Sequence, residues 1–192
     1  MSPDIFDNPI VFSLFRLFVH NSFKGRLKVL KQLNLSGDEK VIDICCGTGF
    51  FSQFLPKDYV GVDNNKFFID HAKKTYGKNF ILQDATNLKQ FGNKSFDVAF
   101  VIDCLHHFPD GLASKVLSEA CRLADKVFIM DLPSQSNFNL IGKVLEKLDR
   151  GKHVRKLDRE MEMLSEFIEI EKKRVFSSGI YKELAVFGRA KS

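Results

Sequence analysis

The sequence predicts an α/β protein with a doubly wound, mostly parallel sheet of seven strands and a C-terminal antiparallel hairpin. Between residues 40 and 131, short apolar segments typical of strands alternate with segments of helical periodicity, which indicates a parallel sheet covered by helices. Residues 96–102 are almost wholly apolar, as in a strand buried on both faces. Only Ser177-Ser178-Gly179 joins the last two predicted strands, which favours an antiparallel pair at the sheet edge.

The spacing of apolar residues places each element in turn. Strands are expected at residues 40–44, 59–63, 80–83, 96–102, 126–131, 166–176 and 181–188. Helices are expected at residues 5–33, 50–55, 66–76, 112–123 and 138–148, with a short one around 158–164. The strongly charged residues 149–159 are expected to connect the helix before them to the closing part of the sheet.

A chain of 192 residues suits one domain with a short appendage. We expect residues 1–34 to form a helical segment, serving as a lid or substrate cover, and residues 35–192 to form the ligand-binding domain. The 44% hydrophobic and 28% charged residues exclude a disordered or collagen-like chain. The excess of 29 Lys and Arg over 24 Asp and Glu allows an anionic partner or a peripheral membrane contact without requiring either.

The first apolar run, residues 10–19, is interrupted by Arg16 and is too short to cross a membrane. It also lacks the basic start of a signal peptide, so neither secretion nor a membrane span is expected. The cysteines are Cys45, Cys46, Cys104 and Cys121, without a C-x-x-C pair, and no zinc or other metal site is expected. Because two of them are adjacent, they suit a disulfide framework poorly, which favours a reducing, cytoplasmic location.

A loop with two glycines follows the first predicted strand. The strand carries Asp43, the loop carries Gly47 and Gly49, and a predicted helix begins directly afterwards. Glycines allow a ligand to approach the backbone closely and adopt positive φ, while the first turn of a helix offers unpaired N–H groups. The segment is therefore a candidate ligand-binding loop.

Two further acids end the next two strands. Asp63 ends the second, where a carboxylate can accept both hydroxyls of a ribose. Asp84 follows the third, where it can accept from an adenine amino group while Ala85 lies against the ring. Either acid alone could be a helix cap. Together with Asp43, they predict a nucleoside site at the carboxyl ends of three consecutive strands.

These residues resemble the class I S-adenosylmethionine-dependent methyltransferases. Residues 43–49 match the D-x-G-x-G-x-G loop of that family, with Cys45 in place of the first glycine. Asp63 and Asp84 match its ribose-binding and adenine-binding acids, and residues 96–108 match its fourth strand and the following segment. The resemblance covers about residues 35–131, although residues 123–126 replace the family's Pro-Gly-Gly turn. The segment 106–108 is especially similar to the small-molecule branch, which includes quinone-biosynthesis-type enzymes.

The resemblance implies a Rossmann-like methyltransferase fold, with S-adenosylmethionine as cofactor and S-adenosylhomocysteine as product. Asp43, Gly47 and Gly49 would hold the methionine part, Asp63 the ribose and Asp84 the adenine. The residues beside these that complete the expected cofactor-binding set are Cys45, Cys46, Asn64, Ala85 and Asp103.

Two adjacent histidines, His106 and His107, are the candidates for catalysis. Methyl transfer from a sulfonium depends largely on positioning, and a base is needed only where the acceptor must lose a proton. Both imidazoles titrate near neutrality, so either could take that proton. A structural role, as a helix cap or in packing against the sheet, is the alternative.

The acceptor is expected to be a small molecule, with apolar or lipid-like compounds among the candidates. Phe6, Phe12, Phe15 and Phe18 could line its pocket or touch a membrane surface, or could simply pack on the sheet. Residues 132–148 are expected to help to shape the pocket. The oligomeric state is left open.

Three other functions are alternatives to a small-molecule methyltransferase. Residues 47–52 are one residue from the NAD fingerprint, but an NAD site does not need Asp43 or Asp84. A non-catalytic S-adenosylmethionine-binding regulatory protein would use the same acids. An RNA methyltransferase would use the basic residues 150–156, which could equally be a solvated connector, and no RNA-binding module accompanies them.

Overall fold

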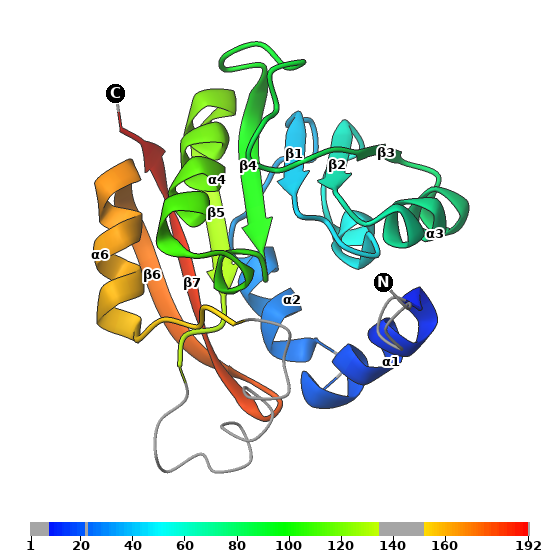
Figure 1. Cartoon of the computed structure of the whole chain (residues 1–192), viewed down its shortest axis with the longest axis horizontal. Helices are drawn as coiled ribbons and strands as arrows, with labels where there is room; N and C mark the ends of the chain where they lie inside the picture. Colours follow the sequence, from blue (N-terminus) through cyan, green and yellow to red (C-terminus); the bar gives the residue numbers. More distant parts are fainter. Residues whose placement is uncertain (1–7, 22, 135–151, 192) are drawn as a thin grey trace.

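A computed structural model describes residues 8–21, 23–134 and 152–191. A single seven-stranded sheet runs through the molecule in the order β3-β2-β1-β4-β5-β7-β6 (Figure 1). Strands β1 to β5 are mutually parallel, and β7 lies antiparallel between β5 and β6. The strands are β1 (Val41–Ile44), β2 (Tyr59–Asp63), β3 (Asn79–Leu82), β4 (Phe96–Ile102), β5 (Ala124–Asp131), β6 (Ile168–Ser178) and β7 (Tyr181–Ala190). The predicted fold class, including the antiparallel closing hairpin, is confirmed.

Helices cover both faces of this sheet. They are α1 (Pro9–Val19), α2 (Lys24–Lys31), α3 (Lys66–Tyr76), α4 (Asp110–Leu123) and α6 (Leu157–Phe167), with short 3₁₀ turns η2 (Phe50–Phe54) and η3 (Leu105–His107). The bounds of β2, α3 and β4 agree with the prediction. The helix predicted at residues 138–148 lies outside the described residues. None of the described helices is long and apolar enough to cross a membrane.

The prediction of one continuous helix at residues 5–33 was wrong, because the chain forms two helices there, α1 and α2. Phe23 has φ 59, a left-handed conformation that cannot continue a helix. The turn between β6 and β7 packs at the same point, where the N–H of Ile180 donates to the carbonyl of Val19 at 3.1 Å. Residues 50–54 form a 3₁₀ turn instead of the predicted helix, and Pro56 follows shortly afterwards.

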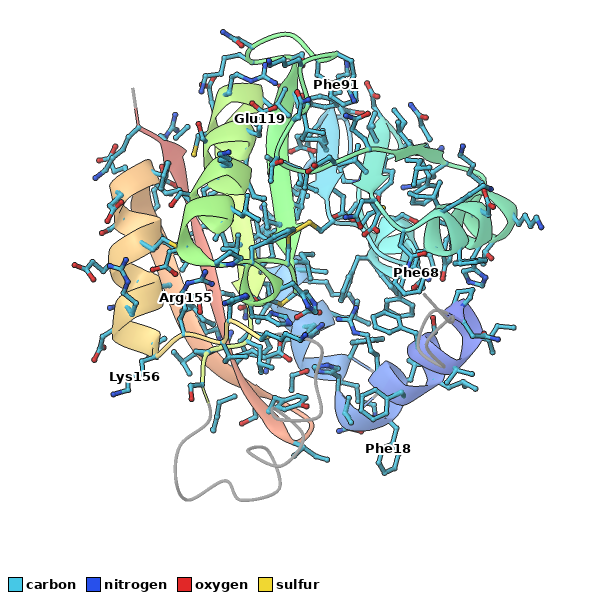
Figure 2. All side chains as sticks on the ribbon, in the orientation of Figure 1. Phe18, Phe68, Phe91, Glu119, Arg155 and Lys156 are labelled. Carbon is cyan, nitrogen blue, oxygen red and sulfur yellow. A yellow bond between two sulfur atoms is a disulfide. The ribbon has the colours of Figure 1, made fainter. Side chains whose placement is uncertain are left out.

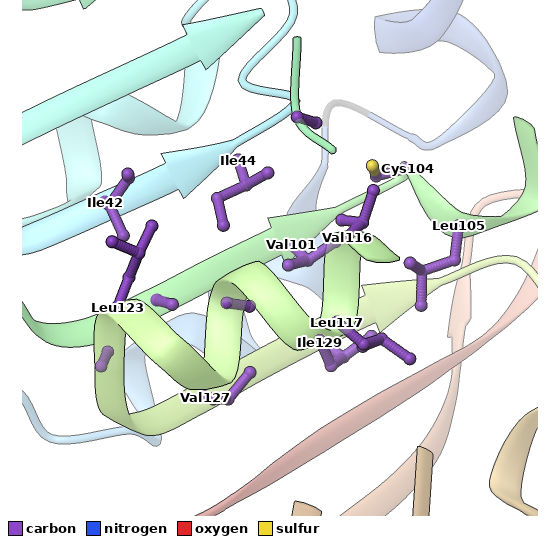
Figure 3. Close-up of a cluster of buried hydrophobic side chains, with 14 of the residues drawn as sticks. Ile42, Ile44, Val101, Cys104, Leu105, Val116, Leu117, Leu123, Val127 and Ile129 are labelled. Atoms are coloured by element: carbon purple, nitrogen blue, oxygen red, sulfur yellow. The ribbon is translucent and has the colours of Figure 1, made fainter. Parts of the chain in front are cut away.

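Alternating side chains of the buried strands form two cores. On β4, Ala99 and Val101 join the cluster under α4 and α6, whereas Val98, Phe100 and Ile102 join the cluster under α2, η2 and α3. Figure 3 shows the first cluster, in which α4 lies over the strands. The strand β4, apolar on both faces, lies at the centre of the sheet, and its carboxyl end lies beside that of β1.

Candidate functional site

The glycine loop turns the chain from β1 into η2. Gly49 has φ +78, and a Cβ there would lie 2.8 Å from the ring of Phe80 and 2.9 Å from the Cβ of Ala72. Gly47 has φ +55, but no heavy atom lies within 4 Å of its Cβ position. Glycine at 49 is therefore required by packing, whereas glycine at 47 leaves open space beside the loop. Cys45, in place of the family's first glycine, adopts φ 63.

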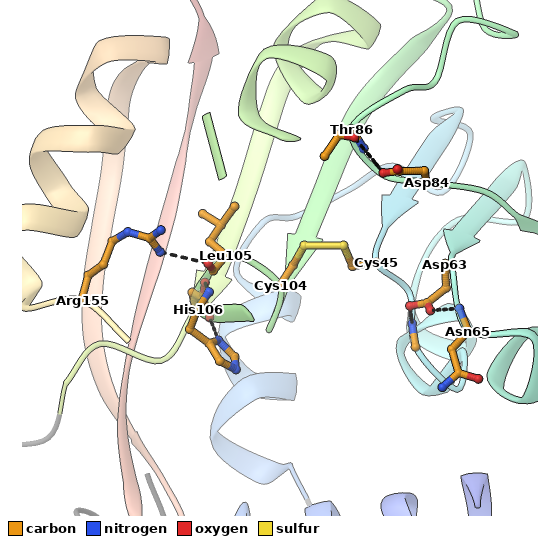
Figure 4. The surroundings of a disulfide bond; sticks show 11 residues. Cys45, Asp63, Asn65, Asp84, Thr86, Cys104, Leu105, His106 and Arg155 are labelled. Atoms are coloured by element: carbon orange, nitrogen blue, oxygen red, sulfur yellow. Dashed lines mark hydrogen bonds and ion pairs between the residues drawn. A yellow bond between two sulfur atoms is a disulfide. The ribbon is translucent and has the colours of Figure 1, made fainter. Parts of the chain in front are cut away.

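Asp63 ties this loop to the end of β2. Its Oδ2 accepts from the peptide N–H of Gly47 at 2.9 Å, and its Oδ1 accepts from that of Asn65 at 2.8 Å (Figure 4). Burial raises the pKa of Asp63 above its usual value, although these backbone donors oppose the shift. Asn64 is exposed beside it. The predicted ribose-binding acid thus lies directly against the glycine loop.

Asp43 is buried beneath the same loop. One carboxylate oxygen, Oδ2, accepts from the Tyr59 hydroxyl at 2.9 Å, while Oδ1 is buried and has no hydrogen-bond partner among the described residues. Burial, with a smaller contribution from the nearby charge of Asp63, raises the pKa of Asp43 to about 7. A buried carboxylate oxygen without a donor is costly, and a cationic group with N–H donors would satisfy it.

Asp84 follows β3 in an Asx turn. Its Oδ1 accepts from both the peptide N–H and the hydroxyl of Thr86, each at 2.8 Å (Figure 4). The carboxylate is exposed, whereas Ala85 is buried in the core under α4. Because β1, β2 and β3 are adjacent and parallel, their carboxyl ends lie side by side. Asp43, Asp63 and Asp84 therefore lie in a row along this end of the sheet.

Asp103 is held by arginines from the two N-terminal helices. Its carboxylate contacts Arg16 of α1 and Arg26 of α2, with 2.7 Å between Arg26 Nη2 and Asp103 Oδ1. Asp103 was predicted to bind cofactor, but in this structure its carboxylate anchors α1 and α2 to the end of β4. This anchoring role was not predicted from the sequence.

Arg26 is fully buried and also pairs with a buried glutamate of β7. Its Nε lies 2.7 Å from Oε2 of Glu183, and its Nη2 lies 2.7 Å from Oε1. Burial raises the pKa of Glu183, but the charge of Arg26 and the hydrogen bond with His20 together outweigh burial and hold the pKa below its usual value. His20, 2.9 Å from the same carboxylate, has its pKa lowered to about 3 by burial and by Arg26, and is therefore neutral.

The cysteines were expected to suit a disulfide framework poorly, yet one pair is bonded. Cys45 of the glycine loop and Cys104, two residues beyond β4, form a disulfide with their Cα atoms 5.9 Å apart (Figure 4). They meet because β1 and β4 are neighbours in the sheet, which spacing along the chain does not reveal. Burial raises the pKa of the Cys46 thiol, so this free cysteine is a poor nucleophile.

His106 and His107 follow β4 in η3 and differ in their surroundings. His106 is buried, and its peptide N–H donates to Oδ2 of Asp131 at 3.0 Å, while its ring Nδ1 contacts Oδ1 of the same carboxylate. His107 is exposed, with its ring centroid 4.2 Å from that of His106. Asp131 lies at the end of β5 and was not among the predicted site residues. The signal that could have identified it is an acid at the end of a predicted strand, directly before Leu132.

The charges around Asp131 decide its ionisation. Burial raises its pKa, but the charge of His106 and the hydrogen bond between them outweigh this, so the pKa is lowered. Burial, followed by the nearby charge of Asp131, raises the pKa of Glu160 to about 9. Glu160 is therefore protonated at neutral pH, and the pair His106–Asp131 is accompanied by a neutral acid.

The basic tract 150–156 is only partly described, since residues 150 and 151 lie outside the described ranges. Arg155 is buried and donates to the carbonyls of Leu105 at 2.9 Å and Phe108 at 2.6 Å (Figure 4). Its Nε lies 2.8 Å from Asp110. Arg155 therefore fixes the segment that carries both histidines, and its guanidinium does not face solvent as a nucleic-acid contact would.

The expected phenylalanines divide between the site and the surface. Phe12 packs against Phe68 of α3 with ring centroids 4.8 Å apart, and Phe15 packs against a small buried cluster. Phe18 points outward from α1 (Figure 2). Ser13 of α1 donates to Thr48 of the glycine loop at 3.3 Å. Phe6 and most of residues 132–148 lie outside the described residues.

These residues fit a nucleoside with a cationic amino-acid part. The unpartnered oxygen of Asp43 suits an ammonium group, and the open space at Gly47 allows close approach to the loop. Asp63 and Asp84 supply acceptors for hydroxyl and amino groups farther along the edge. Within the described ranges, no group of His, Cys, Asp and Glu is arranged to hold a metal ion.

Comparison with known proteins agrees with this geometry. Residues 41–126 match the family described as a methyltransferase domain. A demethylmenaquinone methyltransferase from Lactobacillus johnsonii is 32% identical over 129 residues, which are 58% of this chain and 51% of that protein. The chain spans about half the length of this curated relative.

Two solved structures share the fold. A magnesium protoporphyrin IX methyltransferase from Synechocystis, with bound S-adenosylhomocysteine, aligns with a TM-score of 0.69 and 20% identity, covering 97% of each chain. A possible histamine N-methyltransferase from Thermotoga maritima aligns with a TM-score of 0.74 and 18% identity, covering 97% of this chain and 98% of that one.

Proposed function

We propose, from the premise that this chain belongs to the class I S-adenosylmethionine-dependent methyltransferases, that it methylates a small-molecule acceptor and releases S-adenosylhomocysteine. The observation that carries the proposal is the row of Asp43, Asp63 and Asp84 on three adjacent strand ends, with one Asp43 oxygen buried and unpartnered among the described residues. The cofactor supplies an activated methyl group on a sulfonium, and the residues of the chain bind and orient it.

Each carboxylate has a proposed part in binding. Asp43 accepts from the ammonium group, and the backbone of Gly47 and Gly49 borders the methionine part. Asp63 accepts from the ribose hydroxyls and keeps the loop in place through its bond to Gly47. Asp84 accepts from the adenine amino group. The NAD alternative gives no role to Asp43 or Asp84, so these two residues favour the methyl donor.

His106 is proposed to take the proton that an acceptor hydroxyl, ammonium or carbon acid loses on methylation. The Asp131 carboxylate contacts Nδ1, which favours a proton on that nitrogen and leaves Nε2 as the basic atom. The exposed His107 is the second candidate. The helix α1, which contacts the glycine loop through Ser13, is proposed to cover the site.

A small-molecule acceptor is supported by the names of the relatives, which include quinone and porphyrin methyltransferases. An RNA acceptor is not favoured, because Arg155, the arginine of the basic tract that the structure describes, is buried against backbone carbonyls. A non-catalytic cofactor-binding protein would not need a histidine held by a buried carboxylate, so the His106–Asp131 pair favours catalysis.

Calorimetric titration with S-adenosylmethionine and S-adenosylhomocysteine, with NAD as a negative control, tests the cofactor. We expect micromolar binding of both sulfur nucleosides, lost in Asp63→Ala and kept in Asp58→Ala, an exposed acid before β2. Absence of binding by the unmodified chain would overturn the proposal. Release of S-adenosylhomocysteine with quinol, porphyrin and RNA acceptors then separates the acceptor classes, and binding without any turnover would support the regulatory alternative.

A further inference from the structure

The helix α1 has an apolar face that is largely exposed among the described residues. Ile10, Leu14 and Phe18 are 60%, 62% and 80% exposed, and their spacing of four residues places them on one side of the helix. Phe18 points away from the body of the molecule (Figure 2). The other exposed large apolar residues include Phe54 of η2 and Phe67 of α3, and α3 contacts both η2 and α1.

Basic residues accompany this face, and acidic ones are absent from its stretch of sequence. Between Asp7 and Asp38 there is no Asp or Glu, but there are five Lys and Arg residues. This number equals the excess of basic over acidic residues in the whole chain, which has 29 Lys and Arg and 24 Asp and Glu. Two of the five, Arg16 and Arg26, are paired with Asp103. The remaining three, on α2, are exposed: Lys24, Lys28 and Lys31.

We propose that α1 and the exposed lysines of α2 form a docking surface for an anionic lipid bilayer. An apolar helix face together with exposed lysines on the following helix is a combination that suits a membrane interface, since the apolar side chains enter the headgroup boundary and the lysines attract acidic lipids. A second copy of the chain fits less well, because the same stretch of a partner would carry no Asp or Glu to pair with these lysines.

The opposite side of α1 faces the candidate site. Ser13 contacts Thr48 of the glycine loop, Phe12 packs on Phe68, and Arg16 contacts Asp103 at the end of β4. A bilayer bound on the outer face would therefore lie one helix away from the site. Membrane docking itself does not depend on the proposed function, but delivery of an apolar acceptor from the bilayer to this site does.

Co-sedimentation of the full chain with phosphatidylcholine–phosphatidylglycerol vesicles tests the surface. We expect binding that weakens with added salt and that is much lower on pure phosphatidylcholine vesicles. Leu14→Ser with Phe18→Ser should lower partitioning about tenfold or more, because the burial of either side chain is worth at least a factor of ten. The matched control, Leu112→Ser with Val175→Ser, removes exposed apolar residues from α4 and β6 and should not change partitioning.

Charge variants separate the electrostatic part. Lys28→Glu with Lys31→Glu should lower binding to anionic vesicles, whereas Lys115→Glu with Lys126→Glu, on α4 and β5, should lower it far less. The proposal is overturned if the unmodified chain stays in the supernatant, or if control and test variants lose binding equally. It is also overturned if light scattering shows a dimer that Phe18→Ser dissociates and no vesicle binding is seen. Calorimetry with S-adenosylmethionine on the same variants distinguishes loss of docking from failure of the proposed function.

Discussion

The carboxylate of Asp131 holds His106 at two points. Its Oδ2 accepts from the peptide N–H of His106 at 3.0 Å, and its Oδ1 contacts the ring Nδ1. The two residues end neighbouring segments, Asp131 on β5 and His106 just beyond β4, so parallel pairing of these strands brings them together. A histidine held in this way has both its position and its tautomer determined by one side chain.

The first prediction concerns this pair. Asp131→Asn should lower kcat about 10- to 100-fold, because one end of an amide is a donor and cannot accept both N–H groups. KM should change little, and ¹⁵N NMR should show a changed tautomer of His106. Asp125→Asn, at an exposed acid near the other end of β5, is the control. An unchanged tautomer together with unchanged kcat would show that Asp131 does not position His106.

The second prediction concerns Asp43, whose pKa in the folded chain is about 7, above its value in an unfolded chain. Between these two values the folded state holds the extra proton, so stability present below about pH 4 is lost as the pH rises through about 7. Asp43→Asn, which does not titrate, should be about 2–4 kcal/mol more stable than the unmodified chain at pH 8 and about equal to it at pH 4.

The same substitution should weaken S-adenosylmethionine binding, because a neutral amide replaces the carboxylate proposed to accept from the ammonium group. Urea unfolding across pH 4–8 and calorimetry check the two effects, with the exposed Asp38→Asn as control. Equal pH dependence of the variant and the unmodified chain would show that folding does not raise the pKa of Asp43.

The third prediction concerns the buried ion pair Arg26–Glu183. Glu183→Gln should destabilise the chain by about 3–5 kcal/mol, because it leaves the fully buried guanidinium of Arg26 with only the partly exposed carboxylate of Asp103 as a compensating charge. The exposed pair Lys66–Asp70 is the matched control, and Asp70→Asn should change the stability far less, because solvent screens this pair. Urea unfolding measures both, and similar losses in the two variants would contradict the assigned burial.

The fourth prediction concerns the cysteines. Alkylation of the denatured chain without reductant should modify two thiols, those of Cys46 and Cys121, and alkylation after reduction should modify all four. Mass spectrometry of the alkylated peptides identifies the positions. Modification of Cys45 or Cys104 before reduction would show that the disulfide is absent in solution. The variant Cys104→Ser should then leave Cys45 reactive without any reductant.

The alternation of strands and helices, the glycine loop and the acids at or near the ends of β1, β2 and β3 were all predictable from the amino-acid sequence. These are local features, since a buried strand is a short apolar run and a tight turn needs glycine. The segments β2, α3 and β4 were therefore predicted at their observed bounds. The break at Phe23 was not predicted, because it depends on the turn of a hairpin more than 150 residues away that packs against the end of α1.

The contacts of the charged and sulfur-containing residues depend on the tertiary structure and could not be predicted from the sequence. Asp103 is bound by Arg16 and Arg26, and Cys45 is joined to Cys104, across distances in sequence over which periodicity carries no information. Asp131 likewise meets His106 only because β4 and β5 pair in register. Apolar patterning specifies which side chains turn inward, but the order of the strands in the sheet decides which of those side chains meet.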